Sequence, residues 1–199
     1  MRLFVALEID EAIRERIQRF ADELKLLTSN VRWVSPESLH ITLKFIGEQS
    51  ESKVGAIEGA LGKLSAPSMQ ISFRGCGFFP NAKSSRVFWI GVEAGAGLAQ
   101  IAKQIDEKLA PLGIEHEKRT FSPHITVARA RGGSGAPGRQ RGDRPNQSFA
   151  AVQERLAGIP SPEFGTMTAR EFFLYRSQLS SEGSRYTKIA RFALSTQEA

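Results

Sequence analysis

The chain lacks several features that would assign it to a common class of protein. Its 199 residues contain one cysteine, Cys76, which excludes an intramolecular disulfide and cannot form a thiolate metal site by itself. No apolar run approaches the ~20 residues needed to cross a bilayer. The opening MRLFVALEID has neither the basic region nor the cleavage site of a signal peptide. We therefore expect a cytoplasmic protein without a membrane segment.

Motifs of the large nucleotide-binding and hydrolase classes are also missing from the sequence. There is no dinucleotide fingerprint and no phosphate-binding loop, so a doubly wound nucleotide-binding fold has little support. No Gly-x-Ser-x-Gly occurs, so the sequence lacks the turn that usually carries the nucleophile of a serine hydrolase. The formal charge of +6 favours a polyanionic partner such as nucleic acid, although such a charge also simply aids solubility.

The spacing of apolar residues predicts interleaved strands and helices. Paired strands between helices indicate antiparallel sheets, and thus the α+β class. Residues 75–85 are interpreted as a turn-rich connection. Residues 130–146 are rich in glycine and arginine with almost nothing apolar, which predicts a mobile loop. The expected strands are 2–9, 31–34, 39–46, 69–74, 86–93, 122–128, 170–177 and 186–194, and the expected helices are 11–27, 51–64, 97–112 and 147–157.

One short motif occurs twice and uses two of the three histidines in the chain. It reads LHITLKF at 39–45 and PHITVAR at 123–129. Because side chains alternate along a strand, His40 and Thr42 share one face of the first strand. His124 and Thr126 share one face of the second. Each strand is expected to bury its other, apolar face.

The same alternation makes predictions for the residues that follow each motif. It places Lys44 beside His40 and Thr42. It places Phe45 and Arg129 on the apolar faces, so Arg129 reaches the histidines only if its strand ends, bulges or twists after Val127.

A single His-Thr pair would usually mean only the polar face of a half-buried strand. Two copies with the same alternation, each after a Ser-Pro near the strand entrance, favour a functional interpretation instead. His116, in GIEHEKR, lies outside the repeat and is interpreted as a solvated or locally hydrogen-bonded residue.

Two imidazoles across a substrate can act as a general base and a general acid, because the pKa of histidine lies near ~6.5. Phosphodiester hydrolysis needs this pair, and threonine hydroxyls can donate hydrogen bonds to the phosphoryl oxygens. A catalytic zinc normally takes three protein ligands, and no Asp, Glu or Cys stands two or four residues after either histidine. We therefore expect neither a metal nor another cofactor.

The paired motifs, about eighty residues apart, resemble those of the two-histidine (2H) phosphoesterases, and especially the RNA 2′,3′-cyclic phosphodiesterases, also called 2′-5′ RNA ligases. The resemblance extends over MRLFVAL, VRWVSPESLHITLKFIGE, FFPNAKSSRVFWIGVE, FSPHITVAR and LYRSQLSSEGSRYTKIARFAL. It implies one bilobal domain over residues 1–199, with two pseudo-symmetric antiparallel sheets lining a cleft and helices outside.

The resemblance also implies roles for individual residues. His40 would donate a proton to the leaving 3′ oxygen, and His124 would accept a proton from water, although the two near-symmetric motifs do not decide this order. Thr42, Thr126 and Arg129 would bind the phosphate.

Three further residues are possible substrate contacts: Lys44 by its place on the strand, and Phe4 and Tyr186 as aromatic residues that could stack on a base. Aromatic residues in strands are more often part of the core.

The implied activity is metal-independent opening of a 2′,3′-cyclic phosphate at an RNA end to a 2′-phosphomonoester, with 2′-5′ ligation as the same transfer run backwards. Two alternatives stay open: a cyclic phosphate on a small nucleotide, and a non-catalytic module that binds RNA ends. The protein is expected to act as a monomer.

Overall fold

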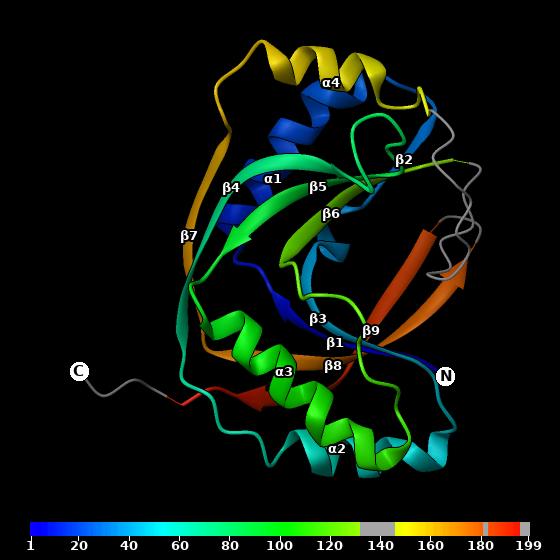
Figure 1. Cartoon of the computed structure of the whole chain (residues 1–199), viewed down its shortest axis with the longest axis vertical. Helices are drawn as coiled ribbons and strands as arrows, with labels where there is room; N and C mark the ends of the chain where they lie inside the picture. Colours follow the sequence, from blue (N-terminus) through cyan, green and yellow to red (C-terminus); the bar gives the residue numbers. More distant parts are fainter. Residues whose placement is uncertain (132–145, 181–182, 196–199) are drawn as a thin grey trace.

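Two antiparallel sheets form the framework of the protein (Figure 1). The computed structural model describes residues 1–131, 146–180 and 183–195. One sheet has the strand order β3-β1-β8-β9 and the other has the order β2-β6-β5-β4-β7. The strands are β1 (Arg2–Glu8), β2 (Val31–Trp33), β3 (His40–Glu48), β4 (Met69–Phe79), β5 (Val87–Glu93), β6 (His124–Ala130), β7 (Glu163–Ala169), β8 (Glu171–Ser180) and β9 (Gly183–Ala193). The predicted α+β class is confirmed.

Four helices flank the sheets, with α1 and α4 toward one end of the molecule and α2 and α3 toward the other (Figure 1). Their buried residues recur at helical spacing, as in α1, where Ile13, Ile17, Ala21 and Leu24 are buried. Helix α1 contacts β7, and α3 contacts β3. The bounds are α1 (Glu11–Lys25), α2 (Val54–Leu61), α3 (Gly97–Leu109) and α4 (Ala150–Ala157), with short 3₁₀ turns at Pro36–Ser38, Glu51–Lys53 and Ala110–Leu112.

The apolar side chains of both sheets and of the helices join one continuous core. Strand β1 shows how the four-stranded sheet divides its two faces. Leu3, Val5 and Leu7 belong to the main core. Phe4 and Ala6, on the opposite face, pack with aromatic residues of β8 and β9 in a second, small cluster. We call this second group the aromatic cluster; it consists of Phe4, Ala6, Phe173 and Tyr175, with Tyr186 packed against it.

Two segments differ from the sequence prediction. Residues 75–79 were predicted to be part of a connection, but they continue strand β4. The glycines in this segment have structural reasons of their own. A Cβ atom on Gly77 would clash with the ring of Trp89, and Gly75 has a φ of +69° at an irregularity in the pairing. Strand β7 was not predicted at all. Most of the predicted loop 130–146 lies outside the described residues, although Ala130 is the last residue of β6.

A bulge interrupts the alternation of both motif strands at the same place. In β3, Thr42 pairs with Ala6 and Lys44 pairs with Val5, so Leu43 is an extra residue. In β6, Thr126 pairs with Trp89 and Ala128 pairs with Phe88, so Val127 is the extra residue there. The residue after each bulge therefore turns to the face opposite the one that strict alternation predicts.

The bulge in β3 turns Lys44 into the core, which corrects its predicted place beside His40. Lys44 is 5 % exposed. Its ammonium donates hydrogen bonds to Asp106 Oδ1 of α3 at 2.5 Å and to the carbonyl oxygen of Glu115 at 2.8 Å. Asp106 also accepts from the Glu117 amide (2.9 Å) and from His116 Nδ1 (2.6 Å). Asp106 thus joins β3 and α3 to the segment that leads into β6.

Burial by itself would raise the pKa of Asp106, but the hydrogen bonds from Lys44, His116 and the Glu117 amide outweigh it and lower the pKa to about 2. The carboxylate contributes stability above its unfolded pKa of about 3.9. That contribution is lost as the pH falls through the folded value of about 2.

We expect Asp106→Ala to lower the free energy of unfolding by about 3–5 kcal/mol at pH 7, because it leaves the Lys44 ammonium buried without its carboxylate. Urea unfolding followed by circular dichroism measures the loss. The double variant Lys44→Ala/Asp106→Ala, which gives β3 the alanine that β6 carries at Ala128, should recover part of it. A double variant no more stable than Asp106→Ala would contradict this account.

Candidate active site

The two motif strands lie side by side where the two sheets meet (Figure 1). His40 is the first residue of β3 and His124 is the first residue of β6. Ile41 and Ile125, the next residues, are fully buried in the core, so the histidines and the threonines that follow face the other way. We call the residues on this face the two-histidine site; they are His40, Thr42 and Phe45 of β3 and His124, Thr126 and Arg129 of β6.

Each histidine is held by the backbone two residues before it. His40 Nδ1 lies 2.7 Å from the carbonyl oxygen of Ser38, and His124 Nδ1 lies 2.7 Å from that of Ser122. Because a carbonyl oxygen only accepts, Nδ1 must be the donor in both rings. A neutral imidazole then has its lone pair on Nε2. Both histidines are therefore prepared in the same tautomer, with Nε2 left for a substrate.

The surroundings of the histidines lower the pKa of both imidazoles. For His40 the main cause is desolvation; the bond to Ser38 opposes it, the positive charges of Arg129 and His124 add to it, and the pKa falls to about 4. For His124 desolvation is again the main cause, with the Ser122 bond opposing it and Arg129 adding to it. In the free protein His40 is thus neutral at pH 7, and an anionic ligand would favour its protonation.

Arg129 reaches the site because of the bulge in β6. The extra residue Val127 leaves Ala128 buried and turns Arg129 outward, on the histidine side, where its charge acts on both imidazoles. By strict alternation, Arg129 required the strand to end, bulge or twist after Val127; the structure instead has its bulge at Val127 itself, with the same effect on Arg129. The pKa of Arg129 is lowered, mainly by desolvation; Tyr186 opposes this effect and the charge of Arg2 adds to it.

Phe45 stands at the corresponding position in β3 and was predicted on the apolar face. The bulge instead leaves it 55 % exposed on the side of the aromatic cluster, with its ring centroid 6.3 Å from that of Phe4. Aligning HITLKF with HITVAR pairs Phe45 with Arg129, and this was the available signal that the two residues lie on the same face.

Aromatic rings line the two histidines. Phe4 lies 4.9 Å from the His40 ring, and Tyr186 lies perpendicular to it at 5.2 Å. Phe4 is only 3 % exposed, so it supports the imidazole instead of offering a free face to a base. Phe79, the last residue of β4, has its ring centroid 5.0 Å from that of His124. Phe79 was missed because its segment was assigned to a connection.

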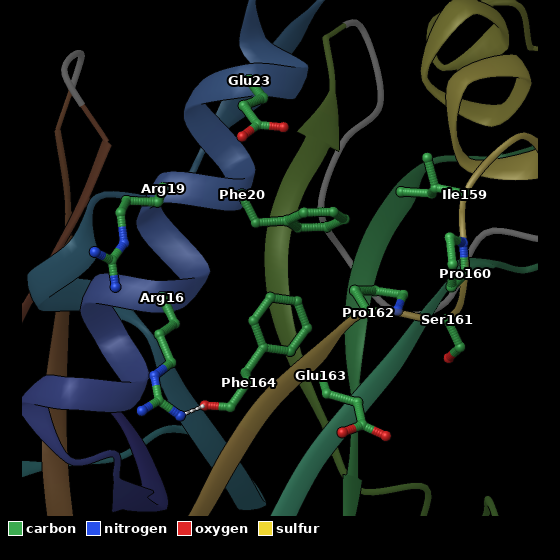
Figure 2. Close-up of a pocket in the computed structure, with 10 residues that line it drawn as sticks. All are labelled: Arg16, Arg19, Phe20, Glu23, Ile159, Pro160, Ser161, Pro162, Glu163 and Phe164. Carbon is green, nitrogen blue, oxygen red and sulfur yellow. Dashed lines mark hydrogen bonds between the residues drawn. The ribbon is translucent and has the colours of Figure 1, made fainter.

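Other features of the molecule lie away from this site. A pocket of about 420 Å³ opens between α1 and residues 159–164, where Arg16 donates to the Phe164 carbonyl oxygen (Figure 2). A second pocket, of about 310 Å³, lies at the start of α3. Neither includes a histidine. Within the described residues, no group of three or more His, Cys, Asp or Glu side chains is arranged to hold a metal ion, and no helix is long and apolar enough to span a membrane.

Comparison with known proteins identifies the family. The family model described as LigT-like phosphoesterase matches residues 7–89 and again 90–186, one match for each motif. The RNA 2′,3′-cyclic phosphodiesterase of Archaeoglobus fulgidus is 38% identical over 96% of this chain and 99% of its own length. That of Methanothermobacter thermautotrophicus is 34% identical over 98% of this chain and 99% of its own.

Solved structures give the same answer. Escherichia coli LigT complexed with 3′-AMP has a TM-score of 0.74 and 29% identity, with 97% of each chain covered. TT0787 of Thermus thermophilus has a TM-score of 0.76 and 27% identity over the whole of both chains. Fold and paired motifs together define a phosphoesterase of the two-histidine class. The chain belongs to the LigT-like phosphoesterase family and is a hydrolase.

We expect Arg129→Gln to raise the pKa of both His40 and His124, because the guanidinium charge lowers both. Two-dimensional NMR titration of the imidazole resonances measures the two values. Arg19→Gln removes the same charge from the exposed face of α1 and should leave both unchanged. Equal shifts in the two variants would show that Arg129 does not face the histidines.

Proposed function

We propose that the protein hydrolyses 2′,3′-cyclic phosphate at RNA ends to a 2′-phosphomonoester, without a metal ion. The observation that carries the proposal is the matched pair of imidazoles, each with Nδ1 bonded to a carbonyl oxygen and Nε2 left for a substrate. The names of the relatives, RNA 2′,3′-cyclic phosphodiesterases from archaea and bacteria, supply the substrate class.

The reaction needs one proton to be removed and one to be supplied. In the proposed scheme a water oxygen attacks phosphorus while His124 Nε2 accepts a proton from it. The bond from phosphorus to O3′ breaks, and His40 Nε2 gives a proton to the departing oxygen. The products are a 2′-phosphate and a 3′-hydroxyl. A 5′-hydroxyl attacking in place of water would instead form a 2′-5′ linkage.

The polar residues of the two-histidine site other than the histidines stabilise the phosphoryl group in this scheme. The hydroxyls of Thr42 and Thr126 can donate to its non-bridging oxygens, where negative charge increases in the transition state. The Arg129 guanidinium supplies the compensating charge. Since the pKa of free His40 is about 4, its proton must be acquired with the substrate. The negative phosphate favours this uptake, because an opposite charge raises the pKa of an imidazole.

Activity should survive chelation and depend on both site histidines. With an oligoribonucleotide ending in a 2′,3′-cyclic phosphate and EDTA present, we expect a 2′-phosphate product. His40→Ala and His124→Ala should each lower kcat by about 10²- to 10⁴-fold, because each removes a proton-transfer group. His116→Ala, whose ring contacts Asp106 and not the site, serves as the matched control.

Three outcomes would count against this proposal. Loss of turnover with EDTA would reject the metal-free mechanism. Equal activity of the three histidine variants would reject the site. Tight binding of the RNA end without any turnover would instead support a non-catalytic module.

Phe45 is the exposed aromatic ring of the site and is proposed to stack on the terminal base. Phe45→Ala should raise KM about 5- to 100-fold, the range given by base–aromatic stacking energies, while kcat changes less. Phe45→Trp should retain the wild-type KM. Leu26→Ala removes another exposed apolar side chain, at the end of α1, and should change neither constant. An unchanged KM in Phe45→Ala would exclude stacking on this ring.

A further inference from the structure

A second guanidinium lies on the same face as the two-histidine site, and the reaction proposed above does not use it. Arg2 is the first residue of β1, two positions before Phe4. Phe4 and Ala6 face the aromatic cluster, whereas Leu3 and Val5 face the main core. The pairing of β1 with β8 is regular from Arg2 to Ala6, so side chains alternate strictly along β1. The side chain of Arg2 is therefore on the same face of the sheet as those of Phe4 and Ala6. This is also the face of His40, whose ring packs against Phe4.

The neighbours of Arg2 tie it to the site. Arg2 pairs with Ser177 of β8, and Ser177 pairs in turn with Tyr186 of β9, the residue whose ring packs on His40. A strand rises about 3.3 Å per residue, so the Cα of Arg2 lies about 6.6 Å along β1 from that of Phe4. Arg2 is near enough to Arg129 for their like charges to act on each other.

The carboxylate opposite Arg2 in the sheet pairs with another group instead. Glu48, the residue of β3 opposite Arg2, lies 3.2 Å from the amino group of Met1. In the part of the chain that the structure describes, no ion pair includes Arg2 or Arg129. Holding like charges together on a partly desolvated face is unfavourable, and a bound anion between or beside them relieves it.

The cyclic phosphate carries one negative charge, and Arg129 already compensates it in the proposed reaction. A second anion is available only if the substrate is longer than one nucleotide, because a nucleic-acid strand carries one charged phosphate per nucleotide. The nearest such group is the phosphodiester on the 5′ side of the terminal nucleotide. A guanidinium binds it well, since two parallel N–H groups match two phosphate oxygens.

We propose that Arg2 forms a second phosphate subsite, which binds the phosphodiester immediately 5′ of the terminal nucleotide and selects oligonucleotide ends over cyclic mononucleotides. This inference rests on the proposed function and adds a specificity-determining residue to it. Arg2 touches no reacting atom, so its contribution belongs to substrate binding.

The test compares three substrates: a 2′,3′-cyclic mononucleotide, a dinucleotide with the same cyclic end, and that dinucleotide with a neutral methylphosphonate as its internal linkage. Wild type should have the highest kcat/KM on the charged dinucleotide. Arg2→Gln should lower this value about 10- to 100-fold, as expected for a charged hydrogen-bonded contact. It should leave the other two substrates unaffected. For the charged dinucleotide, kcat/KM should depend less steeply on salt concentration in Arg2→Gln than in wild type, because one charge–charge contact is lost.

Arg19→Gln on α1 is the matched control and should behave as wild type on all three substrates. Turnover of the mononucleotide by Arg2→Gln reports that this variant is folded. A loss of equal size on mononucleotide and dinucleotide would overturn the subsite, because it would place Arg2 on the cyclic phosphate itself. No loss on any substrate would overturn it as well. Failure of wild type on every substrate would reject the proposed function instead.

Discussion

The active face of this protein depends on one extra residue in each motif strand. Leu43 and Val127 interrupt the alternation immediately after the two threonines. Without the bulges, the side chains of Phe45 and Arg129 would enter the core, and Lys44 would lie on the histidine face instead of being buried. A bulge bends a strand and re-aims the side chains beyond it, and it is often found beside active sites. Here the same device occurs twice, in two strands that lie side by side.

The two motif strands bury different residues after the bulge. In β6 the residue turned inward is Ala128, which is small and apolar and packs without a polar partner. In β3 it is Lys44, whose buried ammonium needs Asp106 from α3. Asp106 in turn holds the segment that leads into β6 through His116 and Glu117. Asp106 therefore compensates the buried charge of Lys44 in β3 and also holds the segment that precedes β6.

Desolvation and the charge of Arg129 both lower the pKa values of the two histidines, against the opposing effect of the Ser38 and Ser122 hydrogen bonds. Packing of Phe4 and Tyr186 desolvates His40, and the charge of Arg129 disfavours its protonation further. A free site with neutral imidazoles and uncompensated guanidinium groups attracts an anion strongly. In the proposed reaction, the bound phosphate raises the pKa of His40 again and so favours the protonated form that an acid needs. The proposed reaction thus couples the charge of the substrate to the protonation of His40, because one phosphate acts on both.

The amino-acid sequence by itself determined the class of fold, most of the helices and strands, and the two His-Thr pairs, because these depend on local periodicity. It did not determine the faces of Lys44, Phe45 and Arg129, since a bulge is a property of pairing with a partner strand and not of the strand alone. Strand β4 was cut short for a related reason: Gly77 suggested a turn, yet its missing side chain makes room for Trp89. The Lys44–Asp106 pair joins residues 62 positions apart, and Arg2 and Arg129 come within electrostatic range only because the two sheets lie together. Only the tertiary structure decided these groupings, because they are contacts between segments distant in the chain.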